Sequence, residues 1–469
     1  MQTKPRPAPE QLKGWERNWR AFLAAAFLLG LAIRLASVLA RPHLAAGGDP
    51  LEYVGQANLL SDGKGWIEPL VYAHTGAHFQ TAKLPPLFTL LMAVCSVVGL
   101  KSFFAHRIWS AILGSLAVPV AAGLGKEVAG RKVAVVAAFG IAVYPNMWMS
   151  DGLAMSETVS PILTMLALWA AYRMWRRPTR TAAALLGLSV GLAALARDEL
   201  ILLALLVLVP VAWLAKSTSR PERLRLAGIG VTGVVVVVAP WIGFNLSRFS
   251  HPVLISDRFG VTVAAANCDS MWHGPLRGYW SMECAARSAV GVHGDESAVD
   301  PVALRRGLHY VSGHLSGLPA IEAVRLGRTF GFYAPENQLQ LDSFIEGRPL
   351  LWAQVGLGSF YGFAALSVAG AVVLRRRGVP IFPMAAVAVD VVVAVLLTYG
   401  QTRFRATLEP VLVLLSAVAV VEAVGEAQLL RRRWKRLRRI LRARGFVRRV
   451  SAWRQTRALA SIRMPLDPS

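Results

Sequence analysis

Five short stretches beside long apolar segments carry acidic and basic side chains that could do chemistry. These stretches are GGDPLEY (47–53), TAKLPPLF (81–88), SDGLAMSET (150–158), LARDEL (195–200) and GQTRFRATLEP (400–410). A carboxylate placed there can accept a proton from a hydroxyl group, and a cation can hold a phosphate. Together such groups suit chemistry on a lipid-linked phosphate, in which a carboxylate activates a hydroxyl and cations or a metal stabilise the departing phosphate.

Each stretch also has a purely structural interpretation. Asp49 stands between two glycines and Pro50, so it suits the N-cap of a helix, and the motif alone favours that over a general base. Lys83 could be an interfacial lysine beside a turn rather than a phosphate contact. Ser156 could cap the next helix beside Glu157. Arg403, which faces outward against the tendency of basic residues to stay inside, favours binding of an anionic head group.

The elements that must position these residues are membrane helices. Hydrophobic residues make up 55% of the 469 residues and charged residues only 17%, which excludes a soluble globular protein, a disordered protein and a disulfide scaffold. We therefore predict an all-α polytopic membrane protein of about ten spans. The predicted spans are residues 18–40, 105–124, 132–149, 157–174, 181–197, 199–215, 225–244, 350–374, 379–399 and 408–428.

The distribution of charge predicts the orientation. The apolar run 86–100 is too short to span, and excluding it places every strongly basic loop on one side, which the positive-inside rule makes cytoplasmic. Both termini then lie in the cytoplasm. The cytoplasmic parts hold 33 Lys and Arg against 7 Asp and Glu, and the remainder holds 18 against 20. The net charge of +24 is thus a topology and anionic-lipid signal, and no nucleic-acid partner is expected.

Five regions follow from this topology. They are a cytoplasmic N-terminus (1–17), a transmembrane module (18–244) with a first outer loop (41–104), a large extracytoplasmic loop (245–349), C-terminal transmembrane helices (350–428) and a basic cytoplasmic tail (429–469). Residues 431–457 of the tail could form a basic helix on the membrane surface, anchored by Trp434 and Trp453, or a solvated tail that only sets the orientation.

The large loop offers a disulfide and a polar–aromatic segment. Cys268 and Cys284 are expected to pair in an oxidising compartment, with two buried thiols as the alternative. Closing that loop would contribute about 3 kcal/mol. Asn267 and the nearby aromatic residues could bind a sugar or acceptor, although most of the aromatic residues are expected in the core of a small loop domain.

The chain resembles the GT-C membrane glycosyltransferases, in particular the branch that holds protein O-mannosyltransferases and the aminoarabinose transferases of lipid A. The resemblance runs through most of residues 20–260 and returns near 400–412. It rests on Asp49, Tyr53, GKGW (63–66), Pro85-Pro86-Leu87, Arg107, Gly130-Arg131, Pro145, Glu157, Leu195, Arg197, Pro240-Trp241, Asn245, Arg403 and Arg405.

The resemblance implies a helical GT-C bundle that moves a hexose or pentose, with inversion, from a polyprenyl-phosphate donor to a glycan, lipid or protein acceptor on the extracytoplasmic face. It implies Asp49 as the base that activates the acceptor. The implied phosphate ligands are Lys83, Arg403 and Arg405, and the implied sugar or acceptor ligands are Glu52, Tyr53, Glu157, Arg197 and Asn267.

Two matters stay open at this point. No cofactor is certain and a divalent metal remains open, because Ala82 stands where aminoarabinose transferases carry a metal-binding Glu. A transporter or flippase of a lipid-linked envelope intermediate is the alternative function. A transporter needs charges at the membrane midplane, where Asp390 is the clear candidate, and paired repeats, of which the sequence shows none.

Overall fold

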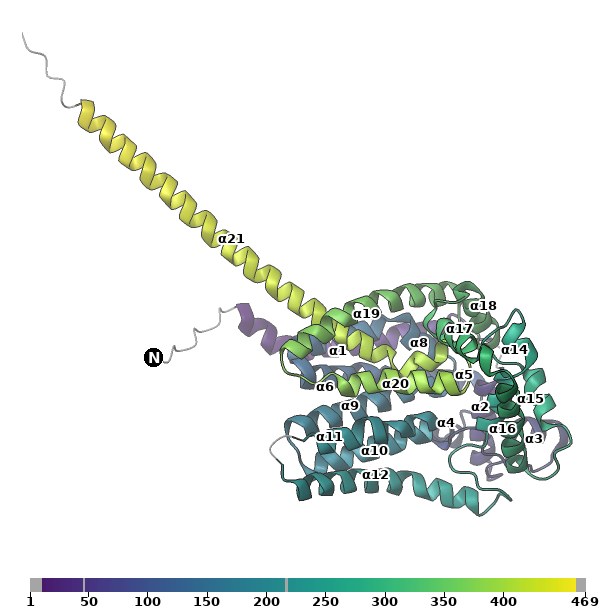
Figure 1. The fold of residues 1–469 in the computed structure, drawn as a ribbon. Coiled ribbons are helices and arrows are strands. Elements are labelled where there is room, and N and C mark those ends of the chain that lie inside the picture. The colour runs from purple at the N-terminus through teal and green to yellow at the C-terminus, as the bar shows by residue number, and fades with distance from the viewer. Residues whose placement is uncertain (1–10, 45–46, 216–217, 461–469) are drawn as a thin grey trace, which may run out of the picture.

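The computed structural model describes residues 11–44, 47–215 and 218–460, and these residues form a helical bundle without strands. In Figure 1 most of the long helices run side by side along one axis, and a group of short helices gathers at one end. We call that end the loop end. The predicted all-α membrane fold is confirmed.

All ten predicted spans are helical. The helices that cover them are α1 (Gln11–Leu39), α5 and α6 (Phe103–Ser115 and Ala117–Ala129), α7 and α8 (Arg131–Val143 and Pro145–Asp151), α9 (Ser160–Arg176), α10 (Arg180–Ala196), the segment from η2 (Asp198–Ile201) through η3 (Ala204–Leu208) to α11 (Val209–Trp213), α12 (Arg220–Leu246), α19 (Leu350–Arg376), α20 (Phe382–Leu397) and α21 (Glu409–Ala460).

These helices differ in length. Within the described residues, five are long and apolar enough to cross a membrane, and the bent pair α7–α8 makes a sixth if it is counted as one span. The helices α9 and α10 have 17 residues each and α20 has 16, so they are about 24–26 Å long, slightly less than the ~30 Å of a hydrocarbon core. The predicted span count is therefore roughly consistent with the structure.

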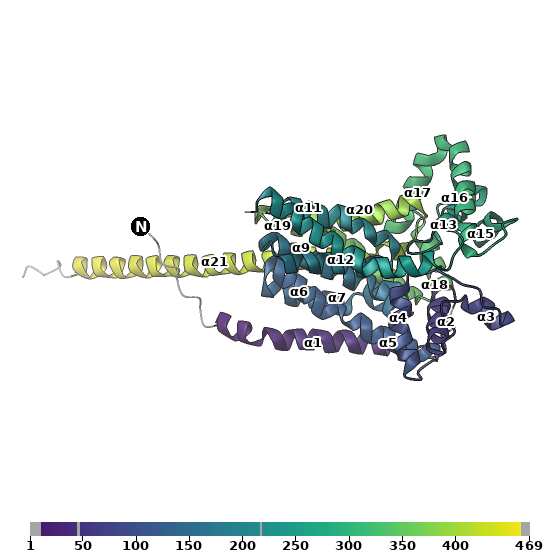
Figure 2. The same cartoon turned by 90° about the horizontal axis from the view of Figure 1, so that it is seen from below.

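The apolar run that was predicted not to span is helix α4 (Pro86–Val97). Its 12 residues are only about 18 Å long, which is too short to cross a bilayer. In Figure 2 it lies near α2 (Asp49–Ser61) and α5, at the loop end. The structure thus agrees with the exclusion of this run from the spans.

The bundle is held by small residues that let backbones approach. A Cβ atom added to Gly187 in α10 would lie 1.9 Å from the carbonyl oxygen of Gly230 in α12. A Cβ atom added to Gly370 in α19 would lie equally close, at 1.9 Å, to the carbonyl oxygen of Leu415 in α21. Such close contacts stabilise helix pairs in a membrane, where lipid tails provide no hydrophobic drive for association.

The loop end is built from two segments. The first loop forms α2, α3 (Pro69–Thr75) and α4. The large loop forms α13 (Phe259–Ala266), α14 (Asp269–His273), α15 (Met282–Ala289), α16 (Glu296–Gly313), η4 (Leu315–Gly317), α17 (Leu318–Phe330) and α18 (Pro335–Glu346). Cys268 and Cys284 form a disulfide beside α14 and α15.

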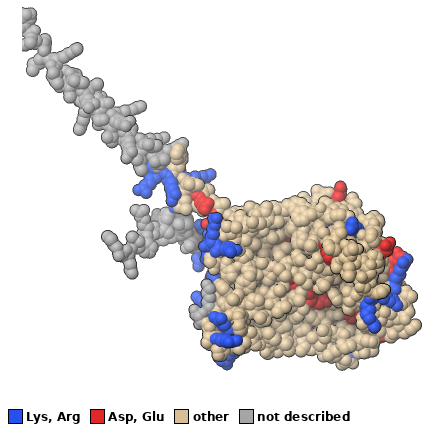
Figure 3. Space-filling model, in the orientation of Figure 1, with Lys and Arg blue, Asp and Glu red and all other residues tan. Residues whose placement is uncertain are grey.

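The opposite end carries the start of α1 and the projecting part of α21 (Figures 1 and 2). Helix α21 continues without a break to Ala460, so the predicted surface helix 431–457 prolongs the last span. The side chain of Trp453 lies outside the described residues. Figure 3 shows Lys and Arg around this end, a broad uncharged belt, and both signs of charge at the loop end. Uncharged surface of this kind suits contact with lipid.

Candidate functional site

Asp49 is the first residue of α2, at the loop end of the bundle. The N-cap position belongs to Gly48, whose φ of 58° lies in the left-handed region that glycine adopts easily, and no side chain caps this helix. The prediction that Asp49 is an N-cap is therefore wrong. Its carboxylate is free to interact with residues that are distant in the sequence.

Two arginines hold the Asp49 carboxylate. The Nη2 atom of Arg403 lies 2.7 Å from Oδ2 of Asp49, and the Nη1 atom of Arg258 lies 3.2 Å from Oδ1. Arg403 comes from η5 (Thr402–Thr407), and Arg258 immediately precedes α13. The large loop and the turn before the last span thus meet at the start of α2.

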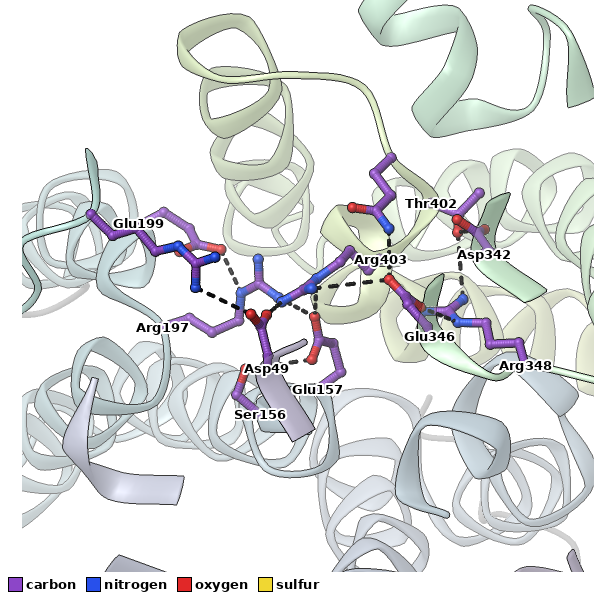
Figure 4. Close-up of polar contacts among 12 residues, drawn as sticks. Asp49, Ser156, Glu157, Arg197, Glu199, Asp342, Glu346, Arg348, Thr402 and Arg403 are labelled. Carbon is purple, nitrogen blue, oxygen red and sulfur yellow. Dashed lines mark hydrogen bonds and ion pairs between the residues drawn. The ribbon is translucent and has the colours of Figure 1, made fainter. Parts of the chain in front are cut away.

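Arg403 also binds a second carboxylate. Its Nε donates to Oε1 of Glu157, at 2.7 Å, and the same oxygen accepts from Nη1 of Arg197 at 2.6 Å. Arg197 in turn donates to Glu199, and its guanidinium lies 5.5 Å from the ring centre of Phe404. Glu157 is buried and is shared by two arginines, as Figure 4 shows.

Lys83 is linked to Arg258 through the carboxylate of Glu52. Its Nζ is 3.1 Å from Oε1 of Glu68 and 3.5 Å from Oε1 of Glu52. Arg258 completes the connection, because its Nη1 is 3.9 Å from Oε2 of Glu52. Cations and carboxylates therefore alternate from Glu68 to Asp49.

A branch leads from Arg403 toward α18. The Nη1 atom of Arg403 is 4.0 Å from Oε1 of Glu346, and Nε of Arg348 is 2.6 Å from Oε2 of the same carboxylate. Figure 4 shows Arg403 between Asp49 and Glu157 on one side and Glu346 on the other. We call the whole set the ion-pair network. It comprises Glu68, Lys83, Glu52, Arg258, Asp49, Arg403, Glu157, Arg197, Glu199, Glu346 and Arg348.

The network fixes the protonation of its central groups. Burial raises the pKa of Asp49, but Arg403 and Arg258 more than offset this, so the pKa lies below its usual value and the group is ionised at neutral pH. For Glu52 burial outweighs Arg258 and Lys83, and the pKa is raised. For Lys83 the effect of burial is outweighed by Glu52 and Glu68, so its pKa is raised and it stays charged.

The structure brings together most of the predicted site residues. Asp49, Glu52, Lys83, Glu157, Arg197 and Arg403 all belong to the ion-pair network. Tyr53 lies one residue beyond Glu52, where it is buried and packs edge-on against Phe88 at 4.9 Å between ring centres. It contributes packing beneath the network.

Two predicted ligands lie elsewhere. Arg405 donates to Glu409 at 2.7 Å and to the carbonyl of Thr329 at 2.9 Å, so it stabilises the turn before α21 and does not join the network. Asn267 accepts from Trp272 at 3.1 Å and from Arg325 at 2.8 Å, which makes it part of the core of the loop domain. The proposed ligand roles of both residues are therefore not supported by their positions.

Five members of the network were not among the predicted site residues: Glu68, Glu199, Arg258, Glu346 and Arg348. For Arg258 a signal was present, because it is a basic residue on the outer side of the predicted topology, as Arg403 is. Glu68 and Glu346 offered no comparable signal. Both are single acids in loops whose folding depends on distant contacts.

The network does not fit a divalent cation in this arrangement. Among the described residues, no group of three or more His, Cys, Asp or Glu side chains converges as metal ligands. The carboxylates of the network are paired with arginines or a lysine instead. We therefore propose no role for a metal ion in the reaction.

Comparison with known sequences gives a family match. The profile of the family described as dolichyl-phosphate-mannose-protein mannosyltransferase matches residues 83–244, about a third of the chain. A search of curated proteins finds no significant match. The matched segment contains Lys83, Glu157 and Arg197 of the network.

Comparison with solved structures decides the fold. The archaeal oligosaccharyltransferase AglB from Archaeoglobus fulgidus, in complex with an inhibitory peptide and a dolichol-phosphate, matches 89% of this chain with a TM-score of 0.56 and 18% identity. The chain has the fold of the GT-C membrane glycosyltransferases. The fold expected from the GT-C resemblance is thus confirmed. The chain spans about half of the length of AglB, 52%.

Two further structures are similar. The A. fulgidus oligosaccharyltransferase in complex with Zn and sulfate has a TM-score of 0.53 and 18% identity, over 87% of this chain and 50% of that one. ArnT from Cupriavidus metallidurans, bound to undecaprenyl phosphate, has a TM-score of 0.40 and 15% identity, over 89% of this chain and 79% of that one. At a TM-score of 0.40 the second likeness supports no further conclusion.

Proposed function

We propose that this GT-C protein is a membrane glycosyltransferase that moves a sugar from a polyprenyl-phosphate donor to an acceptor hydroxyl, with Asp49 as the general base. The mannosyltransferase profile over residues 83–244 and the dolichol-phosphate in the complex of AglB support the donor class. Neither the profile nor the AglB complex distinguishes a hexose from a pentose as the transferred sugar.

One observation carries the proposal: Asp49 is an ionised carboxylate between two arginines at the loop end of the bundle. A base for glycosyl transfer must stand near a cation that can receive the phosphate, because both act on the same transition state. Arg258 and Arg403 meet this requirement directly through their contacts with Asp49.

The accessible cations are the ones best suited to the donor phosphate. The side chains of Arg258 and Lys83 are 36% and 33% exposed, whereas that of Arg403 is 16% exposed. A phosphate can therefore reach Arg258 and Lys83 from the surface, where it would replace the carboxylates that pair with them. Lys83 acts as a point charge, and Arg258 can donate two parallel hydrogen bonds.

Donor binding also prepares the base. A phosphate that takes Arg258 weakens one of the two ion pairs that hold the pKa of Asp49 below its usual value. The pKa of Asp49 then rises, which makes the carboxylate a stronger base. Arg403 remains on the other oxygen and keeps the carboxylate in position.

The chemical step balances as a single displacement. Asp49 takes the proton of the acceptor hydroxyl, and the hydroxyl oxygen forms a bond to the anomeric carbon. The bond between that carbon and the phosphate oxygen breaks with inversion. The polyprenyl phosphate leaves with an added negative charge, which Arg258 and Lys83 stabilise.

The proposed orientation places this site outside the cytoplasm. The basic end of the bundle in Figure 3 is the end from which α1 and α21 project, and basic segments favour the cytoplasm. Both termini would then be cytoplasmic. We expect a reporter fused near residue 176 to report the cytoplasm, and an outside signal would reverse the proposed orientation.

The transporter alternative has less support. A transporter needs charged groups along a path through the membrane midplane. The described charges of the network gather at the loop end, and the buried pair of Arg34 with Asp151, at 2.6 Å, lies near the end of α1 on the same side. Asp390 in α20 is the exception, and its substitution should leave sugar transfer measurable if the protein is an enzyme.

The test uses the full chain in lipid nanodiscs with undecaprenyl phosphates that carry labelled mannose, galactose or arabinose. Asp49→Asn should reduce release of the sugar by about 10²- to 10⁴-fold, because it removes the base, while donor binding changes by a few-fold at most. Envelope glycans of a deletion strain complemented with the same variant should lack the same sugar.

Asp62→Asn is the matched control. Asp62 lies at the other end of α2, with 46% of its side chain exposed, and pairs only with Lys101 among the described contacts. This variant should retain the release rate of the wild type. Full activity in Asp49→Asn would contradict the assignment of Asp49 as base.

A further inference from the structure

A cleft of about 600 Å³ lies at the start of α2, where Pro50, the residue after Asp49, lines it and Lys83 does not. One wall comes from the first loop and the ends of neighbouring helices, with Leu44, Pro50 and Phe103. The other wall comes from α18 and its C-terminal turn, with Ser343, Phe344 and Glu346. The cleft is large enough for one or two sugar rings, since binding sites for small molecules start at about 300 Å³.

The cleft reaches the proposed base through two of its lining residues. Pro50 is bonded directly to Asp49 and lies in the wall. Glu346 lies in the opposite wall, and its Oε1 is 4.0 Å from the Arg403 atom Nη1, whose guanidinium also binds Asp49. The cleft therefore borders the residue next to Asp49 and a carboxylate that shares Arg403 with it, and it does not include Lys83.

The wall of the cleft offers an anionic ligand no cation of its own. The residues that line it include no lysine, arginine or histidine, and its one ionisable group, the carboxyl of Glu346, is already paired with Arg348. A neutral hydroxyl compound would find hydrogen-bond partners in Gln340 and Ser343, which line the cleft as well.

The aromatic residue at the cleft suits the apolar face of a sugar. Phe344 is 90% exposed, so its ring is free to contact a ligand in the cleft that it lines. Gln340 and Ser343 lie on the same helix within one turn and line the same cleft, so polar groups flank the ring. An aromatic face beside amide, hydroxyl and carboxylate groups is the combination that a neutral sugar ring can use on both its CH face and its hydroxyl edge.

We infer that this cleft is the acceptor site and that it binds a neutral sugar residue of a glycan acceptor, with Phe344 against the ring and Gln340 and Ser343 hydrogen-bonded to its hydroxyl groups. The inference rests on the proposed function and narrows its acceptor from glycan, lipid or protein to a glycan. The prenyl chain of the donor is the main competing occupant, but it cannot hydrogen-bond to Gln340, Ser343 and Glu346.

The test measures binding of neutral trisaccharides of mannose, galactose and arabinose to the full chain in nanodiscs by saturation-transfer NMR. At least one should bind, and trigalacturonic acid, which is anionic, should not. Phe344→Ala should weaken binding about three- to tenfold, the range expected for loss of an aromatic contact. Ser343→Trp should abolish binding because the indole fills the cleft.

The matched control is Phe332→Ala. Phe332 is also strongly exposed, at 76%, and lies in the same loop, but it stacks on Tyr361 and does not line the cleft. It should bind the trisaccharide as the wild type does. Its release of sugar from the donor to water should also have the donor KM of the wild type.

The outcomes separate the two proposals. Unchanged trisaccharide binding in both cleft variants would overturn the inference, and so would binding of the anionic trisaccharide alone. A raised donor KM in Ser343→Trp would overturn it in favour of the prenyl chain. If the wild type binds a trisaccharide through Phe344 but never releases sugar from a donor, the cleft inference stands and the proposed function fails.

Discussion

The two sides of Asp49 differ in charge and in space. On one side Lys83 and Arg258 alternate with Glu52 and Glu68, and the hollow beside Lys83 measures only about 20 Å³. On the other side the cleft measures about 600 Å³ and has no cation in its wall. One side is crowded and ionic, and the other is open and neutral.

This difference indicates that the two sides bind different ligands. The ionic side can receive a phosphate only by exchanging its internal carboxylate partners, which limits binding to strongly charged ligands. The open side can receive a neutral molecule without breaking an ion pair. A base placed between them, such as Asp49, can accept a proton from the neutral ligand while the charged ligand departs.

The largest expected effect comes from Arg403, which joins the two sides. Arg403→Gln leaves Asp49, Glu157 and Glu346 without their shared cation, and removal of one partner from a buried ion pair costs about 3–5 kcal/mol. We expect a clear fall in the thermal unfolding midpoint in detergent and loss of both donor turnover and trisaccharide binding.

The control for this effect is Arg377→Gln, at the other end of the bundle. Arg377 pairs with Glu422, and its side chain is 41% exposed. Exposed pairs contribute about 0–1 kcal/mol, so this variant should unfold almost as the wild type does. Equal stability of Arg403→Gln and Arg377→Gln would show that Arg403 does not join the two sides.

The next effect separates the ionic side from the open one. Arg258→Gln removes an accessible cation from the ionic side, and the donor KM should rise about tenfold, because charge-assisted hydrogen bonds contribute about 1.5–3 kcal/mol and Arg258 is partly exposed. Arg287→Gln, which breaks an exposed pair with Glu283, should leave the donor KM unchanged. A donor KM that responds equally to both variants would remove Arg258 from the phosphate site.

The smallest effect is a pH dependence of the open side. Burial, partly offset by Arg348, raises the pKa of Glu346 to about 7, and Asp342, Arg403 and Glu157 face the same group. Ionisation of Glu346 strengthens its bonds to Gln401 and Arg348, which fix the end of α18 that lines the cleft. Trisaccharide affinity should therefore increase about three- to tenfold as the pH rises from about 6 to about 8.

Glu346→Gln keeps the shape of this side chain but does not ionise. Its trisaccharide affinity should be constant over the same pH range. In the wild type, the donor KM should not change with pH in parallel with the trisaccharide affinity. A pH dependence that persists in Glu346→Gln would assign the titration to another group.

The sequence predicted the fold well because apolar runs and basic loops are local signals. Every predicted span is helical, and the 12-residue length of α4 agrees with its exclusion from the spans. The π-helical segment of η3, Ala204–Leu208, was not predictable. Its backbone depends on packing against neighbouring helices, and the run 199–215 reads as uniformly apolar.

The site was predictable only in part. Asp49, Glu157, Arg197 and Arg403 were expected on one face because they follow or precede spans at the same end. Arg258 contacts Asp49 across 209 positions, and no local pattern reports such a contact. The prediction that Asp49 is the N-cap of α2 was wrong for the same reason. Distant arginines are the partners of Asp49, and Gly48 occupies the N-cap position.

The most direct test of the central claim is a crossed measurement on Arg258→Gln and Phe344→Ala. Two constants are measured for both variants in the same nanodiscs. They are the KM of the donor when its sugar is released to water, and the Kd of the neutral trisaccharide that binds. We predict that Arg258→Gln changes only the donor KM and that Phe344→Ala changes only the trisaccharide Kd. If both variants shift the same quantity, the two sides of Asp49 do not bind separate substrates, and the account is contradicted.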